Sequence, residues 1–290
     1  MNHNDLRVRP GHAFRLADID PGYTGAFKDK SDARKTLEND VEELTKLQDV
    51  FAAAASCAVL IVLQGMDSSG KDSAIKHVMS GLNPQGIDVH SFKQPSEEEL
   101  RHDFLWRAGR VLPERGRIMI FNRSYYEDVL VVRVHPDLLA KRGLPAETNG
   151  KNIWQERFES INAFEEHLVR NGTHVLKFFL HLSREEQGRR LLARLDDSTK
   201  TWKFSFTDVT EREHWNDYMK AYEDMLGATS TERAPWYVIP SDHKWFTRTA
   251  VADVLIEKLK SLDLQYPTVD PKLEADLKGI RKQLETEVTS

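Results

Sequence analysis

The residues best suited to chemistry in this chain form a short loop, Gly-Met-Asp-Ser-Ser-Gly-Lys-Asp, at positions 65–72. The spacing G-x-x-x-x-G-K is that of a phosphate-binding loop, in which backbone N–H groups surround a phosphate and the lysine reaches the transferring phosphoryl group. In the usual version a Ser or Thr follows the lysine and coordinates Mg²⁺, whereas this chain carries Asp72 there. The loop therefore predicts phosphate binding with an altered metal site.

The sequence on either side of the loop supports this interpretation. Residues 58–63 are an uninterrupted apolar run, typical of a strand that is buried on both faces. Apolar residues after the loop recur at helical spacing, at Ala74, Ile75, Val78, Met79 and Leu82. The order strand, glycine loop, helix brings the free amides of a helix N-terminus to a bound phosphate. This context disfavours the alternative, a Gly/Ser-rich turn that only joins two elements.

Apolar periodicity predicts a regular alternation of strands and helices around this loop. Residues 1–30 lack such periodicity, and a capping box at Ser96 and Glu99 predicts a helix start. We expect strands at 58–63, 89–92, 117–121, 175–180 and 236–239, and helices at 37–51, 74–82, 96–111, 154–168, after Ser183, at 211–225 and at 247–262. Alternation of this kind predicts an α/β fold whose parallel sheet carries helices on both faces and binds ligands beyond the carboxyl ends of its strands.

Length and composition are consistent with one catalytic domain over residues 1–290. With 40% hydrophobic residues, the chain can bury a single large core. Three segments are set apart from that core: an N-terminal extension and helix over about 1–57, a polar, aperiodic lid over about 193–212, and a charged C-terminal tail over about 267–290.

Composition also limits the compartment and the partners. The single cysteine, Cys57, excludes an internal disulfide framework and a Cys-rich zinc site, so we expect a reducing compartment, by default the cytoplasm. No signal peptide and no apolar run near the ~20 residues of a membrane span is present. The formal net charge of −5 means that a polyanion must be met by a local basic channel. We expect neither a nucleic-acid nor a membrane partner.

A second motif follows the strand at 117–121 and gives the chain a specific resemblance. Residues 121–134 read Phe-Asn-Arg-Ser-Tyr-Tyr-Glu-Asp-Val-Leu-Val-Val-Arg-Val, and together with the loop at 65–72 they resemble the two signature motifs of the polyphosphate kinase 2 family. Further matching segments occur at 176–183, 202–204 and 234–240, so the resemblance extends from about residue 30 to residue 266. The Asn-Arg-Ser-x-Tyr-Glu-Asp variant resembles the class III branch of that family.

The resemblance implies both a fold and an activity. The fold is a three-layer P-loop kinase fold, with a parallel sheet between helices and a helical lid, related in shape to thymidylate kinase. The activity is Mg²⁺-dependent, reversible transfer of the terminal phosphoryl group of inorganic polyphosphate to purine nucleotides, with AMP and ADP both accepted in class III. A homo-oligomer, dimer or tetramer, is the expected assembly.

Phosphoryl transfer requires in-line positioning and cations near the transferred group. The expected catalytic residues are Lys71, Asp67, Arg123 and Asp128. Polyphosphate has no base to recognise, so a basic track is expected, with Lys76 extending it from Lys71 and the arginines at 184, 189, 190 and 194 supplying further cations. The expected substrate-binding residues are Gly65, Met66, Ser68, Ser69, Gly70, Asp72, Lys76, Arg107, Asn122, Arg133 and Arg194.

The expected metal ligands are carboxylates. Mg²⁺ takes one or two protein carboxylates together with phosphate oxygens and waters, and Asp67 and Asp128 are the leading candidates, with Asp72 in place of the missing hydroxyl. Mn²⁺ is an expected substitute. Related strands commonly end in Asp where this chain has Asn122. Because Asn brings no negative charge, the other carboxylates must supply the charge that holds the metal. Asp128 could instead be an ion-pair partner of Arg133.

Two other function classes compete with a polyphosphate-dependent nucleotide kinase. An ATP-dependent nucleoside monophosphate kinase of thymidylate-kinase-like fold would share the loop but use a nucleotide as donor. A non-catalytic phosphate-binding module would keep the loop and lose turnover, although the retention of Lys71, Asp67 and Arg123 together argues against it.

Overall fold

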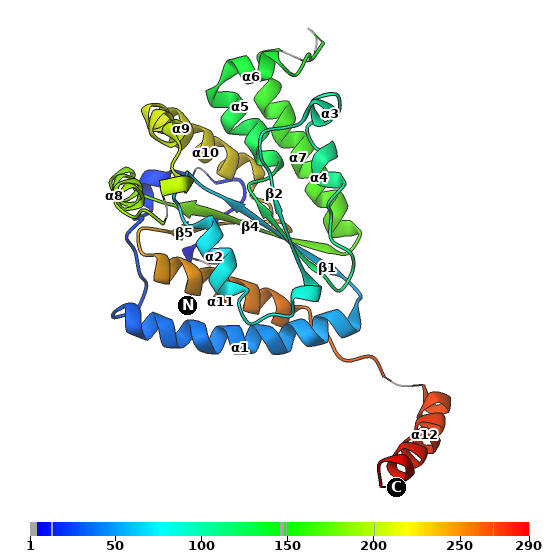
Figure 1. Ribbon diagram of the computed structural model, residues 1–290. Helices are drawn as coiled ribbons and strands as arrows, with labels where there is room; N and C mark the ends of the chain where they lie inside the picture. Colours follow the sequence, from blue (N-terminus) through cyan, green and yellow to red (C-terminus); the bar gives the residue numbers. More distant parts are fainter. Residues whose placement is uncertain are drawn as a thin grey trace.

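Five parallel strands form one sheet in the centre of the computed structural model (Figure 1), which describes residues 5–12, 14–145, 148, 150–199, 201–268 and 270–289. Lys200, inside the expected lid, lies outside these residues. The strand order is β2-β3-β1-β4-β5, and the strands are β1 Ala58–Gln64, β2 Ile87–Ser91, β3 Ile118–Asn122, β4 Thr173–His181 and β5 Trp236–Pro240. All five expected strands are confirmed, with ends that differ by one or two residues.

The sheet is buried on both faces because its central strands are apolar at every position. All seven residues of β1 are buried. Val59, Ile61 and Leu63 pack into one hydrophobic core and Leu60 and Val62 into the other, as the two-residue side-chain period of a strand requires. This is why the strand reads as a continuous apolar run in the sequence.

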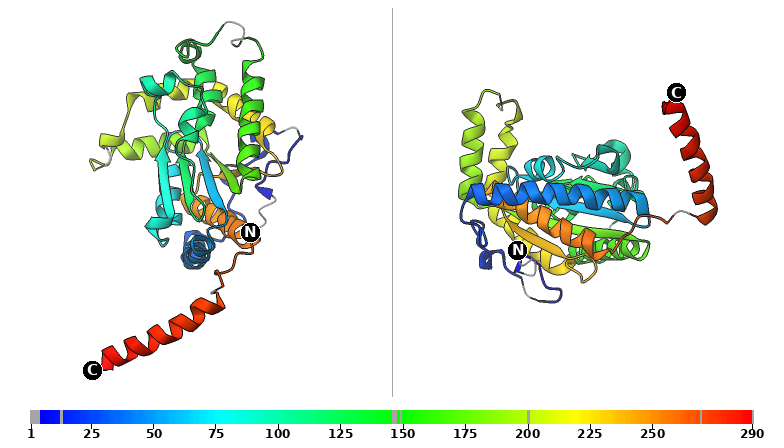
Figure 2. Two further views of the ribbon diagram at one scale, coloured as in Figure 1. Left: turned by 90° about the vertical axis from the view of Figure 1, so that its right-hand side faces the viewer. Right: turned by 90° about the horizontal axis from the view of Figure 1, so that it is seen from below.

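One face of the sheet is covered by three helices, α1 Lys30–Ala54, α2 Lys71–Val78 and α11 Lys244–Ser261. Asp29 begins α1 by accepting hydrogen bonds from the backbone N–H groups of Ser31 and Asp32 at 2.7 and 3.0 Å, the usual role of an N-cap. The helix runs alongside α11 (Figure 2). Buried side chains from all three helices meet the strands in one core, among them Leu44, Phe51, Val78, Val251 and Leu255.

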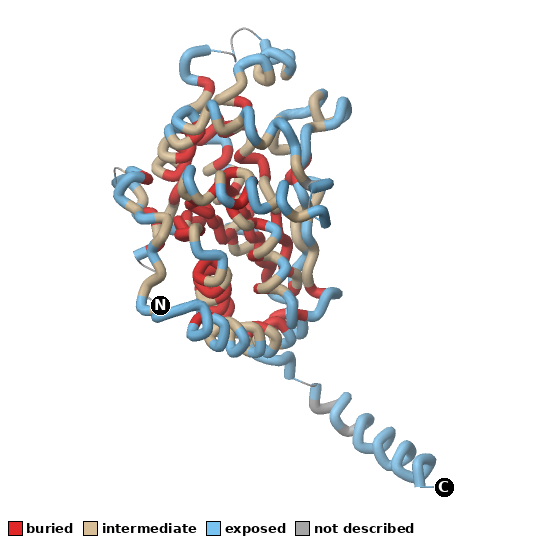
Figure 3. The backbone as a smooth tube through the Cα atoms, turned by 60° about the vertical axis from the view of Figure 1, so that its left-hand side comes forward, coloured by how far each residue is buried: buried red, intermediate tan, exposed pale blue. Residues whose placement is uncertain are grey.

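The opposite face carries α7 Ile153–Arg170 and α10 Trp215–Thr229, with the 3₁₀ turn Tyr125–Val129 and the short helices α4 Trp106–Gly109 and α5 Val131–Val134. Their core includes Phe158, Ile161, Tyr222 and Met225. Figure 3 shows the two cores as buried backbone in the interior of the molecule. The expected three-layer arrangement is confirmed. Shorter elements are α6 Pro136–Ala140 and the 3₁₀ turns Leu16–Asp18 and Pro84–Gly86.

The single helix expected over 96–111 is wrong. The Ser96–Glu99 capping box is present, but α3 ends after one turn, at Glu97–Leu100. Asp103 then accepts hydrogen bonds from the backbone N–H groups of Leu105 and Trp106 at 2.9 and 3.1 Å. A short polar side chain that bonds the backbone two and three residues ahead starts a new turn, so the segment forms two short helices, α3 and α4, and only α4 carries buried residues.

The expected lid and tail both contain helices. Helix α8, Arg184–Leu195, is followed by the 3₁₀ turn Thr201–Lys203, α9 Phe206–Thr210 and the 3₁₀ turn Glu211–His214, so the helix expected from 211 begins at Trp215. The tail forms α12, Pro271–Thr289, which the sequence interpretation did not predict. None of the helices in the described part of the chain is long and apolar enough to cross a membrane.

A buried ion pair joins β4 to α7. Lys177 Nζ donates to Glu165 Oε2 at 2.5 Å and to the carbonyl of Thr229 at 2.6 Å, and the other carboxylate oxygen accepts from the hydroxyls of Tyr125 and Tyr126. The Lys177 and Glu165 side chains are 0% and 2% exposed. Burial lowers the pKa of Lys177 and Glu165 opposes that shift, so each charge depends on the other.

Removing one member of this pair should therefore destabilise the fold more than removing both. We expect Lys177→Met to cost about 3–5 kcal/mol of unfolding free energy, because Glu165 is left as an unpaired buried charge, while Lys177→Met combined with Glu165→Leu recovers much of the loss. Urea unfolding of the two variants beside the parent protein measures this difference. Equal destabilisation by the single and the double change would contradict the account.

Candidate active site

The glycine loop follows β1 and leads directly into α2. Gly65 and Gly70 have φ values of 151° and 109°, which side-chain-bearing residues rarely adopt. A Cβ atom on Gly65 would lie 2.9 Å from the carbonyl oxygen of Leu180, so glycine is required there for both space and conformation. The loop ends at the first turn of α2, whose N–H groups have no partner within the helix and favour an anion.

Lys71 is the first residue of α2, and its side chain turns back over the loop. The ammonium donates to the carbonyl oxygens of Gly65 at 2.7 Å and Met66 at 3.1 Å. Burial lowers the pKa of Lys71 to about 8, with a further contribution from Arg123, while Asp67, Glu127 and Asp72 raise it. The ammonium is thus held at the loop with little solvent around it.

Arg123 brings the second motif to the same place. It follows β3 with a left-handed φ of 62°, and its N–H donates to the carbonyl of Leu63 at the end of β1 at 3.0 Å. Its guanidinium forms ion pairs with Asp67 and, at 3.0 Å, with Glu127. These carboxylates raise the pKa of Arg123, Glu127 most of all. A strained backbone held by surrounding contacts is typical of functional sites.

Asn122 makes a further connection between the motifs. Its side-chain amide donates to Asp72 Oδ1 at 2.8 Å, so the residue that replaces the usual Ser or Thr is oriented by the residue that replaces the usual Asp. One hydrogen bond thus joins the two residues that depart from the usual pattern, Asp72 after the loop lysine and Asn122 at the end of β3.

Two arginines of α8 hold the loop from the other side. Arg190 is buried and donates to the carbonyls of Ser68 at 2.9 Å, Ser69 at 3.1 Å, Ser241 at 2.5 Å and Asp242 at 3.0 Å. Arg194 donates to the hydroxyl of Ser68 at 2.9 Å and pairs with Asp208 in α9 at 3.0 Å. Arg190 therefore supports the loop backbone, whereas Arg194 reaches a loop side chain from the lid segment.

The remaining arginines of that helix point elsewhere. Arg189 is exposed and pairs with Glu185 and Glu186, and Arg184 donates to the carbonyl of Arg212. The four cations expected to act as a set are thus divided between the loop and the surface of α8.

Asp128 is placed away from these contacts, in an internal ion cluster. Its carboxylate pairs with Arg142 and lies 3.7 Å from Arg157, and its side chain is 4% exposed. Burial raises the pKa of Asp128 and the arginines oppose this. The alternative pairing with Arg133 is wrong, because Arg133 contacts Asp224 at 2.6 Å.

Two other expected substrate-binding residues have different surroundings. Arg107 is buried, pairs with Glu99 at 3.3 Å, donates to the carbonyl of Lys93 at 2.9 Å and lies over the Phe92 ring. Lys76 is exposed on α2. The residues that the structure does bring together at the loop are Lys71, Asp67, Asp72, Asn122, Arg123, Arg194 and Ser68.

The sequence interpretation missed three residues at the site. Glu127 was quoted in the second motif but given no role, although its position four residues after Arg123 could have indicated the pair. Gln187 donates to the carbonyl of Asp67 at 2.9 Å, and Arg248 donates to the hydroxyl of Ser73 at 2.8 Å. No sequence pattern signals contacts between elements this far apart in the chain.

The donor set at the loop fits a hard cation such as Mg²⁺. Asp67 and Asp72 both act electrostatically on Lys71, and oxygen donors from one or two carboxylates, completed by phosphate and water, are what Mg²⁺ uses at phosphoryl-transfer sites. The described residues contain no cluster of three or more His, Cys, Asp or Glu side chains suited to a metal. A Mg²⁺ ion at the loop would therefore need phosphate or water oxygens beside these carboxylates.

Comparison with known proteins agrees with this geometry. An "ADP-polyphosphate phosphotransferase" of Rhodopseudomonas palustris is 50% identical over 92% of this chain and 91% of its own length. An "AMP/ADP-polyphosphate phosphotransferase" of Meiothermus ruber is 45% identical over 90% and 94%. The crystal structure of polyphosphate kinase 2 from Arthrobacter aurescens superposes with a TM-score of 0.87 at 38% identity, over 96% of this chain and 95% of that one.

The family comparison covers nearly all of the folded body. The match to polyphosphate kinase 2 extends over residues 27–267, close to the limits of about 30 and 266 expected from the motifs, and it includes the glycine loop, the second motif and the lid segment. The chain belongs to the polyphosphate kinase 2 family.

Proposed function

We propose that this protein transfers the terminal phosphoryl group of inorganic polyphosphate to AMP and ADP, reversibly and with Mg²⁺. The observation that supports this most strongly is the convergence of Lys71, Arg123 and Asp67 at the glycine loop in a chain of this family. Two relatives that match nearly its whole length are named for ADP or for AMP and ADP, which supports acceptance of both nucleotides, as in class III.

The chain's own residues supply binding and charge. Lys71, Arg123 and Arg194 can direct three cations at phosphate oxygens, where negative charge develops during transfer. Lys71 donates hydrogen bonds to two loop carbonyls, and a phosphate bound in the loop would offer a charged acceptor in their place. Asp67 and Asp72 would hold the Mg²⁺ or Mn²⁺ ion, which neutralises phosphate charge when bound.

The proposal also includes the assembly and the location. A dimer or tetramer is part of it, and one surface for such an assembly is argued in the next subsection. A cytoplasmic location is supported by the nucleotide substrates and by Cys57, which is a buried free thiol.

Turnover with polyphosphate as the donor tests the proposed function. We expect purified protein with Mg²⁺, polyphosphate and AMP or ADP to form ADP or ATP, and Lys71→Ala to lower kcat/KM about 100-fold or more, the loss of at least about 3 kcal/mol for one preorganised charge. Nucleotide chromatography measures both. Product from AMP with ATP as donor, and none with polyphosphate, would identify a nucleoside monophosphate kinase. No product with either donor would indicate a binding module.

The pH dependence of kcat/KM should report Lys71. Because its pKa in the free protein is lowered to about 8, the cation is lost as the pH rises through that value, and kcat/KM for polyphosphate should then fall toward tenfold per unit. Bound phosphate favours the ammonium, so the corresponding limb of kcat should lie at higher pH. The residual activity of Lys71→Arg, which keeps its charge, should lack this limb. A limb unchanged in Lys71→Arg would assign it to another group.

Substitutions of Asp67 and of Asp128 should have different effects on metal dependence and on stability. We expect Asp67→Asn to raise the Mg²⁺ concentration for half-maximal activity severalfold with little change in the urea midpoint. Asp128→Asn should lower the midpoint, because Arg142 and Arg157 lose a buried counter-charge, and leave the Mg²⁺ requirement unchanged. The reverse pattern would assign the metal to Asp128.

A further inference from the structure

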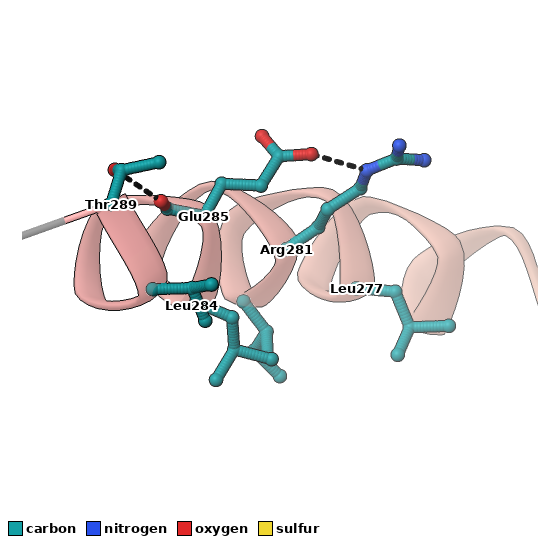
Figure 4. Close-up of a pocket in the computed structure, with 7 residues that line it drawn as sticks. Leu277, Arg281, Leu284, Glu285 and Thr289 are labelled. Atoms are coloured by element: carbon teal, nitrogen blue, oxygen red, sulfur yellow. Dashed lines mark hydrogen bonds and ion pairs between the residues drawn. The ribbon is translucent and has the colours of Figure 1, made fainter.

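Helix α12 presents an apolar stripe that no other part of the described chain covers. The helix projects away from the body of the molecule in every view (Figures 1 and 2). The exposed fractions of its large apolar side chains are 51% for Leu273, 44% for Leu277, 51% for Ile280, 53% for Leu284 and 87% for Val288. Figure 4 shows Leu277 and Leu284 on one side of the helix, with Arg281 and Glu285 on another.

The spacing of these residues is that of a coiled-coil contact. Leu273, Leu277, Ile280 and Leu284 are separated by four, three and four residues, the alternation that keeps side chains on the line where two helices meet. An isolated helix of this length is marginal in water, since helices in proteins owe most of their stability to burial of an apolar face. We therefore expect a partner helix to cover the stripe.

We propose that α12 pairs in antiparallel orientation with α12 of a second copy of this chain. In one register, Leu277 lies opposite Ile280 of the partner subunit and Leu273 lies opposite Leu284 of the partner subunit, and twofold symmetry repeats both layers. All four residues of the stripe are then matched. Self-association through one patch on each copy is what a twofold interface requires.

The charges beside the stripe fit the same register. Glu274 and Arg281 both lie on one flank of the stripe, and antiparallel helices bring this flank against itself. Glu274 then faces Arg281 of the partner subunit, and symmetry repeats the pair. A parallel pair would bring the two Glu287 side chains together within the helices, because Glu287 follows Leu284 by three residues and continues the contact line. In the antiparallel register Glu287 instead lies opposite Asp270 of the partner subunit, which precedes the helix. A parallel pair would also replace the Glu274 contact of Arg281 with Asp276.

Sedimentation velocity of the full-length protein over a range of concentrations tests the proposal. We expect a reversible association that Leu277→Lys combined with Leu284→Lys weakens at least about tenfold by removing the apolar layers. The particle mass at a fixed concentration should fall by a factor of two where no contact between the bodies joins the same two copies. Polyphosphate-dependent turnover should be unchanged, because α12 lies outside the active site. Association that is unaffected by these changes would overturn the proposal.

Charge exchange tests the orientation. Arg281→Glu should weaken association severalfold, and adding Glu274→Arg should restore it. Glu285→Gln is the matched control, because it removes the Arg281–Glu285 pair within the helix at 2.8 Å without changing the flank of the stripe. Restoration by Asp276→Arg in place of Glu274→Arg would overturn the antiparallel arrangement. Helix content measured by circular dichroism shows whether each variant keeps α12.

Discussion

The parallel pairing of β1 with β3 is the constraint on which the site depends. Leu63 lies beside Asn122 in the register of these strands, so the glycine loop and the second motif leave the sheet at the same edge, although they are far apart in the sequence. The hydrogen bond from Arg123 to Leu63 extends this pairing by one residue and holds Arg123 in its left-handed conformation. Its guanidinium then reaches Asp67, and Asn122 reaches Asp72. Sheet register thus determines which side chain meets which carboxylate.

The charge balance at the loop supports the proposed Mg²⁺ ion. Three cationic side chains, Lys71, Arg123 and Arg194, lie among four carboxylates, those of Asp67, Asp72, Glu127 and Asp208. A polyphosphate chain would add several negative charges to a region with no positive excess. A Mg²⁺ ion held by Asp67 and Asp72 would offset that charge, and Asp72 would hold the ion through a carboxylate where the usual loop offers a hydroxyl.

The sequence predicted the parts of this protein that depend on local pattern. Largely apolar runs identified four of the strands, a mixed segment at 89–92 was expected as the fifth, and the loop spacing identified Lys71. These are all properties of a few consecutive residues. The prediction of one helix over 96–111 was wrong because the Asp103 side chain competes with the helix for backbone N–H groups. Apolar periodicity does not reveal that competition. Asp128 has the charge of a metal ligand, yet its surroundings depend on Arg142 and Arg157, which arrive from other elements. The helix in the tail was not predicted because the segment was classified by its many charged residues, and the regular spacing of its apolar residues was not considered.

Arg190 shows how support for the loop can also limit motion. One guanidinium is bonded to two carbonyls of the loop and to two carbonyls that follow β5, and it is packed within α8. Moving the start of α8 would break several buried hydrogen bonds together, each with a desolvation penalty for the groups left unpaired. These hydrogen bonds tie α8 to the loop at Arg190. One turn later, Arg194 joins the loop to α9 through Ser68 and Asp208.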